Sequence, residues 1–272
     1  MVAPIAHSSS RGVGVAILAA CLLGWGLRAA EVARPKVWII AGLAGDAERA
    51  ERYLATVNRL QDALRQQFGV AASDLRILFD RGVKPFPACN EGALMRELDA
   101  VKEASASGRP LWLFFIGQGA TGKDEARFHL PGRDVTARQM GERLSRASSN
   151  SALVIVLTQA GSGAFLESLA GPNRVLVAAA AVGLEDNETE FPHRLAEVCA
   201  RPQEADTNAD GTLSVSELVR AVSTRVDAWY RERGLVNTER AVVDGNGDGR
   251  VDPTPGADDD RYARTAGLTY RR

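Results

Sequence analysis

The sequence of 272 residues has three cysteines, no excess of basic charge, and no long apolar run beyond its first 30 residues. Cys89 and Cys199 lie beyond that segment, and the sequence leaves open whether they pair in an oxidising compartment. The 33 basic and 34 acidic residues give a net charge of −1, which argues against a nucleic-acid partner. Without a later apolar run, we expect a mature chain that does not span a membrane.

Residues 1–29 have the pattern of an export signal. They contain no acidic residue, carry Arg11, and run apolar over residues 12–27, a length that is short for a membrane span. Ala29 provides a small residue for cleavage, so we expect a signal peptide and a periplasmic or extracellular protein. A retained anchor, or a lipoprotein processed at Cys21, is the alternative.

Short apolar strands alternate with amphipathic helices between residues 36 and 200. Apolar and β-branched runs predict strands, and apolar side chains at steps of three and four predict helices. The strands are expected at 37–42, 75–79, 111–116, 153–157 and 175–179, and the helices at 46–67, 91–106 and 136–147. This order predicts a three-layer α/β domain with a mostly parallel sheet, whose sites lie beyond the carboxyl ends of the strands.

Residues Asp206 to Glu217 read DTNADGTLSVSE and place oxygen ligands at the spacing of a calcium loop. Gly211 supplies the sharp turn, and Glu217 can bind through both carboxylate oxygens. The remaining ligands are expected from Asp206, Asn208, Asp210, the Thr212 carbonyl and Ser214. A polar loop with a capping box is the alternative. The sequence thus predicts Ca²⁺ as cofactor, held by an EF-hand-like loop and helix over residues 201–235.

A second acidic loop follows in the tail, residues 236–272, which we expect to be irregular. It repeats the beginning of the first loop, with positions one, three, five, seven and nine held by Asp244, Asn246, Asp248, Arg250 and Asp252. Pro255 stands at position twelve, so the bidentate ligand is missing. The loop is either a second metal site completed by an acidic residue from 258–260, or a solvated acidic turn.

Polar and small residues follow two neighbouring strands. Strand 111–116 ends in Gly117–Gln118–Gly119, and strand 153–157 is followed by TQAGSG. Together with FHLPGRDVT and GPNRVLVAAA further along, these segments resemble the legumain-like cysteine peptidases of the caspase fold over about residues 36–200. In that family a histidine after the third strand is the general base, and a cysteine after the fourth is the nucleophile. Backbone amides beside them hold the oxyanion.

This chain departs from the family at the catalytic positions. Gln118 stands at the histidine position and Ala160 at the cysteine position, so the base and the nucleophile are both absent. The resemblance therefore implies an exported calcium-binding pseudopeptidase that binds a protein or peptide ligand. Its pocket would be bounded by the backbones of Gly117, Gly119, Gly161, Ser162 and Gly163.

Two alternatives remain for the function. An active hydrolase would need relocated catalytic residues, and the candidates are His129, His193, Cys89 and Cys199. We expect both histidines to lie away from the Gln118 strand end. GQGATGK at 117–123 also fits the start of a phosphate-binding loop. Asp124 in place of Ser or Thr, and Pro131 within the required helix, count against a nucleotide-binding protein.

Overall fold

The computed structural model describes Met1 and residues 34–122, 125–181, 188–251 and 258–271. The predicted signal peptide, Lys123 and Asp124 of the phosphate-loop hypothesis, and Asp252 and Pro255 of the second acidic loop lie outside the described residues. The described residues from 34 onward belong to one structural unit.

Six strands form a mostly parallel central sheet, in the order β10-β8-β7-β3-β1-β2. The parallel strands are β1 (Lys36–Ala41), β2 (Leu75–Phe79), β3 (Leu111–Ile116), β7 (Leu153–Leu157) and β8 (Arg174–Ala178). Each lies within one residue of its predicted position. The edge strand β10 (Val242–Asp244) pairs antiparallel with β8 and comes from the tail.

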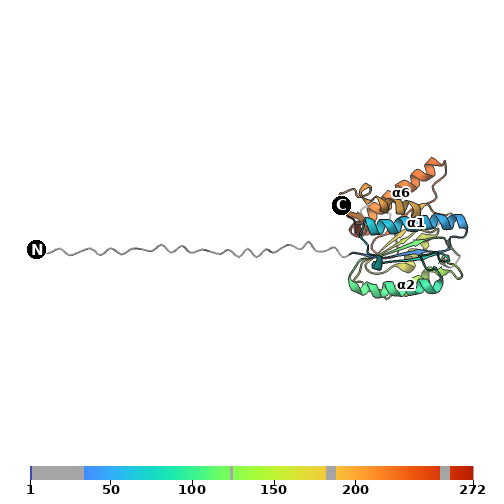
Figure 1. Ribbon diagram of the computed structural model, residues 1–272, viewed down its shortest axis with the longest axis horizontal. Helices are drawn as coiled ribbons and strands as arrows, with labels where there is room; N and C mark the ends of the chain where they lie inside the picture. The colour runs from blue at the N-terminus through green and yellow to red at the C-terminus, as the bar shows by residue number, and fades with distance from the viewer. Residues whose placement is uncertain (2–33, 123–124, 182–187, 252–257, 272) are drawn as a thin grey trace. The chain divides into compact units, whose positions relative to one another are not determined.

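Helices cover both faces of this sheet, as Figure 1 shows for α1 and α6 on one side and α2 on the other. The first face carries α1 (Ala47–Gln66), α5 (Phe191–Ala200) and α6 (Val215–Glu232), and the second carries α2 (Glu91–Ala104), α3 (Ala137–Leu144) and α4 (Leu166–Leu169). Side chains of β3 alternate between the faces: Phe114 packs in the first core and Phe115 in the second. Burial on both faces explains why this strand is continuously apolar.

Side-chain caps fix where the predicted helices begin. The Asp46 carboxylate accepts from the amide of Arg49 at 2.8 Å before α1, and the Asn90 side chain accepts from the amide of Ala93 at 2.9 Å before α2. Thr136 forms a capping box before α3. These caps lie at the strand-to-helix turns and so help to shape the carboxyl edge of the sheet.

The segment after β3 forms a small antiparallel sheet of β4 (Gly119–Thr121), β5 (Ala126–Phe128) and β6 (Val135–Thr136). A phosphate-binding loop leads from its strand directly into a helix. Here β4 and β5 pair as strands instead, so the described backbone does not lead into the helix that the phosphate-loop hypothesis requires.

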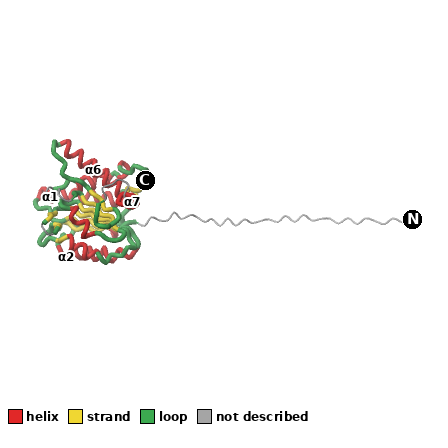
Figure 2. Tube along the Cα trace, turned by 180° about the vertical axis from the view of Figure 1, so that it is seen from behind, coloured by secondary structure: helices red, strands yellow, loops and turns green. Residues whose placement is uncertain are grey.

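The described residues of the tail contain regular elements, which corrects the expectation of an irregular segment. Besides β10 it contains α7 (Asp258–Thr265), which packs against α6, and β11 (Gly267–Thr269), which pairs with β9 (Thr212–Ser214). Figure 2 shows α7 close to the C-terminus. Ala263 and Leu268 are almost fully buried in the first core. Strands of three residues are too short to show a period of two, so the sequence pattern could not predict them. They form through packing against the rest of the fold.

No helix in the described part of the chain combines the length and the apolar character needed to cross a bilayer.

Candidate metal centre

The loop 206–217 has a backbone frame held by hydrogen bonds between its own ligand residues. The pairs are Asp206 Oδ2 with the Gly211 amide (2.9 Å), Asn208 Oδ1 with the Asp210 amide (2.9 Å) and Asp210 Oδ1 with the Thr212 amide (2.7 Å). Ala209 and Gly211 take positive φ angles of 57° and 87°. A glycine tolerates that conformation without strain, so Gly211 makes the predicted turn at position six.

Asp206, at the first ligand position, has one carboxylate oxygen without a partner. Its Oδ1 is buried and makes no hydrogen bond of good geometry, although the backbone of Ala209 and Asp210 also stabilises this carboxylate, and Oδ2 accepts from the Tyr270 hydroxyl at 2.7 Å. Desolvation by burial would raise the pKa of Asp206, but hydrogen bonds led by Tyr270 and Gly211 outweigh it and the net pKa is lowered. A buried anionic oxygen that lacks a donor is suited to a cation. The donor set of this loop therefore fits calcium.

Glu217, at position twelve, is held by hydrogen bonds on both carboxylate oxygens. Oε1 accepts from the amide and hydroxyl of Thr207, each at 2.9 Å, and Oε2 accepts from the amide and hydroxyl of Ser214 at 3.1 and 2.7 Å. The Ser214 hydroxyl in turn accepts from the Glu217 amide, which completes the capping box. Among the described residues, no group of three or more His, Cys, Asp and Glu side chains is arranged to hold a metal ion. Calcium binding therefore requires the Glu217 carboxylate to exchange these donors for the ion.

The last strand of the chain supplies a partner for the calcium loop. β9 carries loop positions seven to nine, and it pairs antiparallel with β11, with Leu213 opposite Leu268. Both leucines are buried, and the Tyr270 amide donates to the Gly211 carbonyl at 3.0 Å. Sequence reasoning missed this pairing. The signal that was available is GLTY at 267–270, a short apolar and β-branched segment after a polar helix.

The second acidic loop repeats the frame of the first loop over positions one to seven. The pairs are Asp244 Oδ2 with the Gly249 amide (2.8 Å), Asn246 Oδ1 with the Asp248 amide (2.9 Å) and Asp248 Oδ1 with the Arg250 amide (2.9 Å). Gly247 and Gly249 take φ angles of 74° and 85°, close to those at positions four and six of the first loop. Asp244 is fully buried.

Asp259 on α7 takes the place of a position-twelve glutamate in this second loop. Its Oδ1 accepts from the Gly245 amide at 2.7 Å, just as Glu217 Oε1 accepts from the Thr207 amide at the same loop position. The helix lies directly over the loop, because a Cβ on Gly245 would come within 1.9 Å of the Asp259 carbonyl oxygen. The sequence offered three acidic residues that could reach this loop, and in the fold Asp259 accepts a hydrogen bond from it.

Gln118 and Ala160 follow β3 and β7 at the carboxyl edge of the central sheet. The two strand ends touch, because a Cβ on Gly119 would come within 2.8 Å of the Ala160 carbonyl oxygen. Gln118 Nε2 donates to the Ala44 carbonyl after β1 at 2.8 Å. The neighbouring Gln159 is fully buried, and neither of its amide atoms has a partner among the described residues. Leaving a buried amide unpaired lowers the stability of the fold. The donor and the acceptor of Gln159 are therefore free to bind a ligand at this edge.

Some residues of the predicted pocket already make hydrogen bonds within the protein. The Gly163 amide donates to the Ala180 carbonyl at 2.9 Å, and the Ser162 hydroxyl accepts from the Ala180 amide at 3.0 Å. Gly119 belongs to β4, whose register places it opposite Phe128. The Ser162 side chain is therefore a buried structural contact with the segment that follows β8.

The two histidines differ in their position relative to this edge. The His129 amide donates to the Gln118 carbonyl at 3.0 Å, so the expectation that His129 lies away from this strand end is wrong for its backbone. The reason is that the β4–β5 hairpin turns the chain back onto the strand end. The His129 ring pairs with Asp134 at 2.8 Å. His193 lies between α1 and α5, where its Nδ1 is 2.6 Å from the Thr56 hydroxyl.

The two cysteines are buried free thiols on opposite faces of the sheet. Cys89 belongs to the core under α2, and Cys199 to the core under α1 and α5. Burial raises the pKa of both thiols, so neither is a ready nucleophile at neutral pH. Because the sheet separates the two thiols, Cys89 and Cys199 do not form the disulfide that the sequence left open.

Comparison with known proteins gives a family match over the predicted calcium loop. The EF hand family matches residues 203–223. No curated protein sequence matches the chain. Among solved structures, the chain is similar to protein GSU0716 from Geobacter sulfurreducens, with a TM-score of 0.48 and 11% identity over 88% of this chain and 98% of that chain. A likeness at this level carries no argument about function.

Proposed function

We propose that this protein is an exported calcium-binding pseudopeptidase of caspase type, which acts as a binding or scaffold protein. The observation that carries the calcium part is the EF-hand loop itself, with its formed frame and the unpartnered Asp206 Oδ1. Asp206, Asn208, Asp210, the Thr212 carbonyl, Ser214 and Glu217 would hold the ion. Calcium supplies charge neutralisation there, because it offsets the repulsion between the loop carboxylates.

Isothermal titration calorimetry of the full chain with calcium tests this assignment. We expect a dissociation constant in the range of ~10⁻⁴–10⁻³ M, as is usual for exported modules. Glu217→Gln should weaken binding strongly, because the loop loses its bidentate carboxylate. Glu232→Gln is the matched control, since Glu232 is an exposed residue near the end of the same helix. Equal affinities for both variants would refute the site.

The proposal that the peptidase centre is inactive rests on the residues at the two strand ends. Gln118 and Ala160 offer neither base nor nucleophile, and the described cysteines are buried elsewhere. The unpartnered amide of Gln159 supports ligand binding at this edge, because a peptide group offers both a donor and an acceptor.

A peptidase assay with asparaginyl, aspartyl and arginyl reporters tests this part of the proposal. We expect no turnover by the purified chain. Gln118→His combined with Ala160→Cys would recover weak activity, whereas either change alone would recover none, since base and nucleophile act as a unit. Turnover by the unchanged chain that a thiol alkylator abolishes would contradict the proposal.

The second acidic loop is a further proposed calcium site. Its support is the frame shared with the first loop and the placement of Asp259 over it. Calorimetry of the unchanged chain would then give two calcium ions per chain, and Asp244→Asn would reduce the number to one. A stoichiometry of one for the unchanged chain would assign this loop to a purely structural role.

A further inference from the structure

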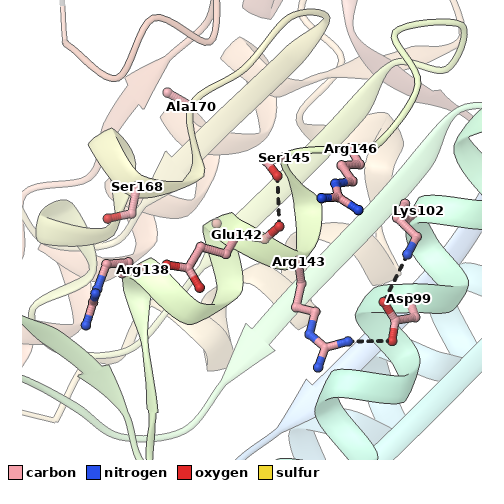
Figure 3. Close-up of a pocket in the computed structure, with 10 residues that line it drawn as sticks. Asp99, Lys102, Arg138, Glu142, Arg143, Ser145, Arg146, Ser168 and Ala170 are labelled. Atoms are coloured by element: carbon pink, nitrogen blue, oxygen red, sulfur yellow. Dashed lines mark hydrogen bonds and ion pairs between the residues drawn. The ribbon is translucent and has the colours of Figure 1, made fainter.

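Two surface regions of the chain combine a cavity with clustered cations, and they differ in how those cations are paired. The first is a cavity of about 540 Å³ between α2, α3 and α4 (Figure 3). There, Arg143 and Lys102 both contact Asp99, at 2.9 and 3.2 Å. Arg138 pairs with Glu125 at 3.3 Å. Three of the four cations that line this cavity are therefore already paired with carboxylates of the protein.

The second region lies at the amino edge of the central sheet, where two adjoining cavities meet. Their volumes are about 470 and 180 Å³, and both are lined by Arg34, Gly69 and Arg271. Arg65 lines the larger cavity. The smaller cavity has a mainly apolar lining that includes Pro35, Phe68, Pro110 and Tyr270. The region is thus a cationic rim, formed by Arg34, Arg65 and Arg271, beside a small apolar recess.

The three arginines of this rim have unused guanidinium groups. Within the described ranges, the side chains of Arg34, Arg65 and Arg271 make no hydrogen bond or ion pair. The carboxylate that lines the larger cavity is Asp62, so the rim keeps an excess of two positive charges. The rim differs from the cavity in Figure 3 in pairing, since three of the four cations that line that cavity contact a carboxylate.

The backbone at each of these arginines is fixed, although the side chains are exposed. The Arg34 carbonyl accepts from Arg109 Nε at 2.9 Å, and Arg109 is itself held by both oxygens of Asp74, at 3.0 and 2.7 Å. The Arg271 amide donates to the Gln67 carbonyl at 2.7 Å. Arg65 lies in the last turn of α1. Three separate segments of the chain therefore present a guanidinium to one space.

Gly69 leaves room for the Arg271 side chain against the end of α1. Its φ of 66° favours glycine, and a Cβ there would come within 3.0 Å of Nε and Nη2 of Arg271. The arginine side chain therefore lies along the backbone at this turn. A larger residue at position 69 would push it out of the rim.

We propose that this rim binds a phosphate group, carried by inorganic phosphate or by an anionic lipid headgroup. A guanidinium presents paired donors that match phosphate oxygens, and several of them from different directions suit a tetrahedral phosphate anion better than a planar carboxylate. The cavities hold enough space for such a group beside the apolar recess. The site shares no ligand residue with the proposed calcium and peptide sites, and it adjoins the calcium loop through Tyr270, which lines the recess and donates to Asp206.

Calorimetry with inorganic phosphate, and sedimentation with phosphatidylglycerol or phosphatidylcholine vesicles, test this site on the full chain in the presence of EDTA. Arg65→Ala and Arg271→Ala should each lower affinity about tenfold, the usual range for a charge-assisted hydrogen bond. Asp62→Asn should raise affinity, a gain that an unfolded variant cannot imitate. Arg127→Ala is the matched control, since Arg127 is an exposed arginine on β5 at the other edge of the sheet.

The two ligand sources are separated by the two assays. Phosphate binding that depends on Arg65 and Arg271 supports the site with a free phosphate ligand. Binding to phosphatidylglycerol vesicles alone, with the same dependence, supports it with a lipid headgroup. Absence of binding in both assays, or equal losses for Arg127→Ala and Arg271→Ala, would overturn the proposal.

Discussion

The Tyr270 hydroxyl donates a hydrogen bond of 2.7 Å to Asp206 Oδ2. The third residue from the C-terminus is thus tied to the first ligand position of the calcium loop. The same segment pairs with the loop through β11 and β9. The last strand and the loop are therefore in direct contact, and we expect calcium bound at the loop to stabilise the strand as well.

Replacing Tyr270 by Phe tests this coupling. The change removes one donor to Asp206 and leaves the ring packing in place. We expect calcium affinity to fall several-fold and the free energy of unfolding without calcium to drop by about 1 kcal/mol, the usual net value of one hydrogen bond. Calorimetry and chemical denaturation measure the two effects. A loss of stability with unchanged calcium affinity would show that the contact does not position the ligand.

Calcium should raise the melting temperature of the chain. The ion binds the folded loop preferentially, so at ~100 times the dissociation constant it contributes about 2.7 kcal/mol. Magnesium should do less, because it demands a tight octahedral shell. Glu217→Ala should remove most of the shift by deleting two oxygens and a charge. Melting curves in chelator and in several millimolar calcium measure it, and an equal shift in the Glu217→Ala variant would contradict the assignment.

The chain should lose stability on acidification because of His193. Burial, followed by the charges of Arg52, Arg194 and Arg59, lowers the pKa of His193 to about 4, although Glu188 opposes this. An unfolded histidine titrates near pH 6.5, so the unfolded chain takes up this proton first as the pH falls. Stability from this residue is present above about pH 6.5 and declines towards pH 4, by about 3 kcal/mol at most.

Denaturation curves between pH 7.5 and pH 4 measure this effect. His193→Gln should flatten the decline, because the variant has no imidazole to protonate. The same slope in the variant and the unchanged chain would assign the acid sensitivity to other groups.

Gly245→Ala should disrupt the contact between α7 and the second acidic loop. A Cβ at this position would lie 1.9 Å from the Asp259 carbonyl oxygen, which is backbone and cannot turn away. Overpacking of this kind costs roughly 1–3 kcal/mol, and the second proposed calcium site should be lost with it. Gly92→Ala is the matched control: its Cβ meets ordinary contacts within α2, so it should be neutral or stabilising. Thermal melting and calcium stoichiometry distinguish the two variants.

Local patterns in the sequence were enough for the parallel strands, the helices α1, α2, α3 and α6, and the first calcium loop. A strand buried on both faces must be continuously apolar, as β3 is, and a helix with one buried stripe must repeat its apolar residues every three to four positions. The ligand spacing from Asp206 to Glu217 is equally local, because one turn of chain wraps one ion.

The tertiary structure decided what depends on residues far apart in the chain. Strands β10 and β11 are too short to have a period, and they form because β8 and β9 offer unpaired edges to them. Asp259 reaches the second loop because α7 packs against α6, and Arg34, Arg65 and Arg271 meet because three chain segments converge at one edge of the sheet. Long-range packing sets these positions, so no spacing in the sequence could reveal them.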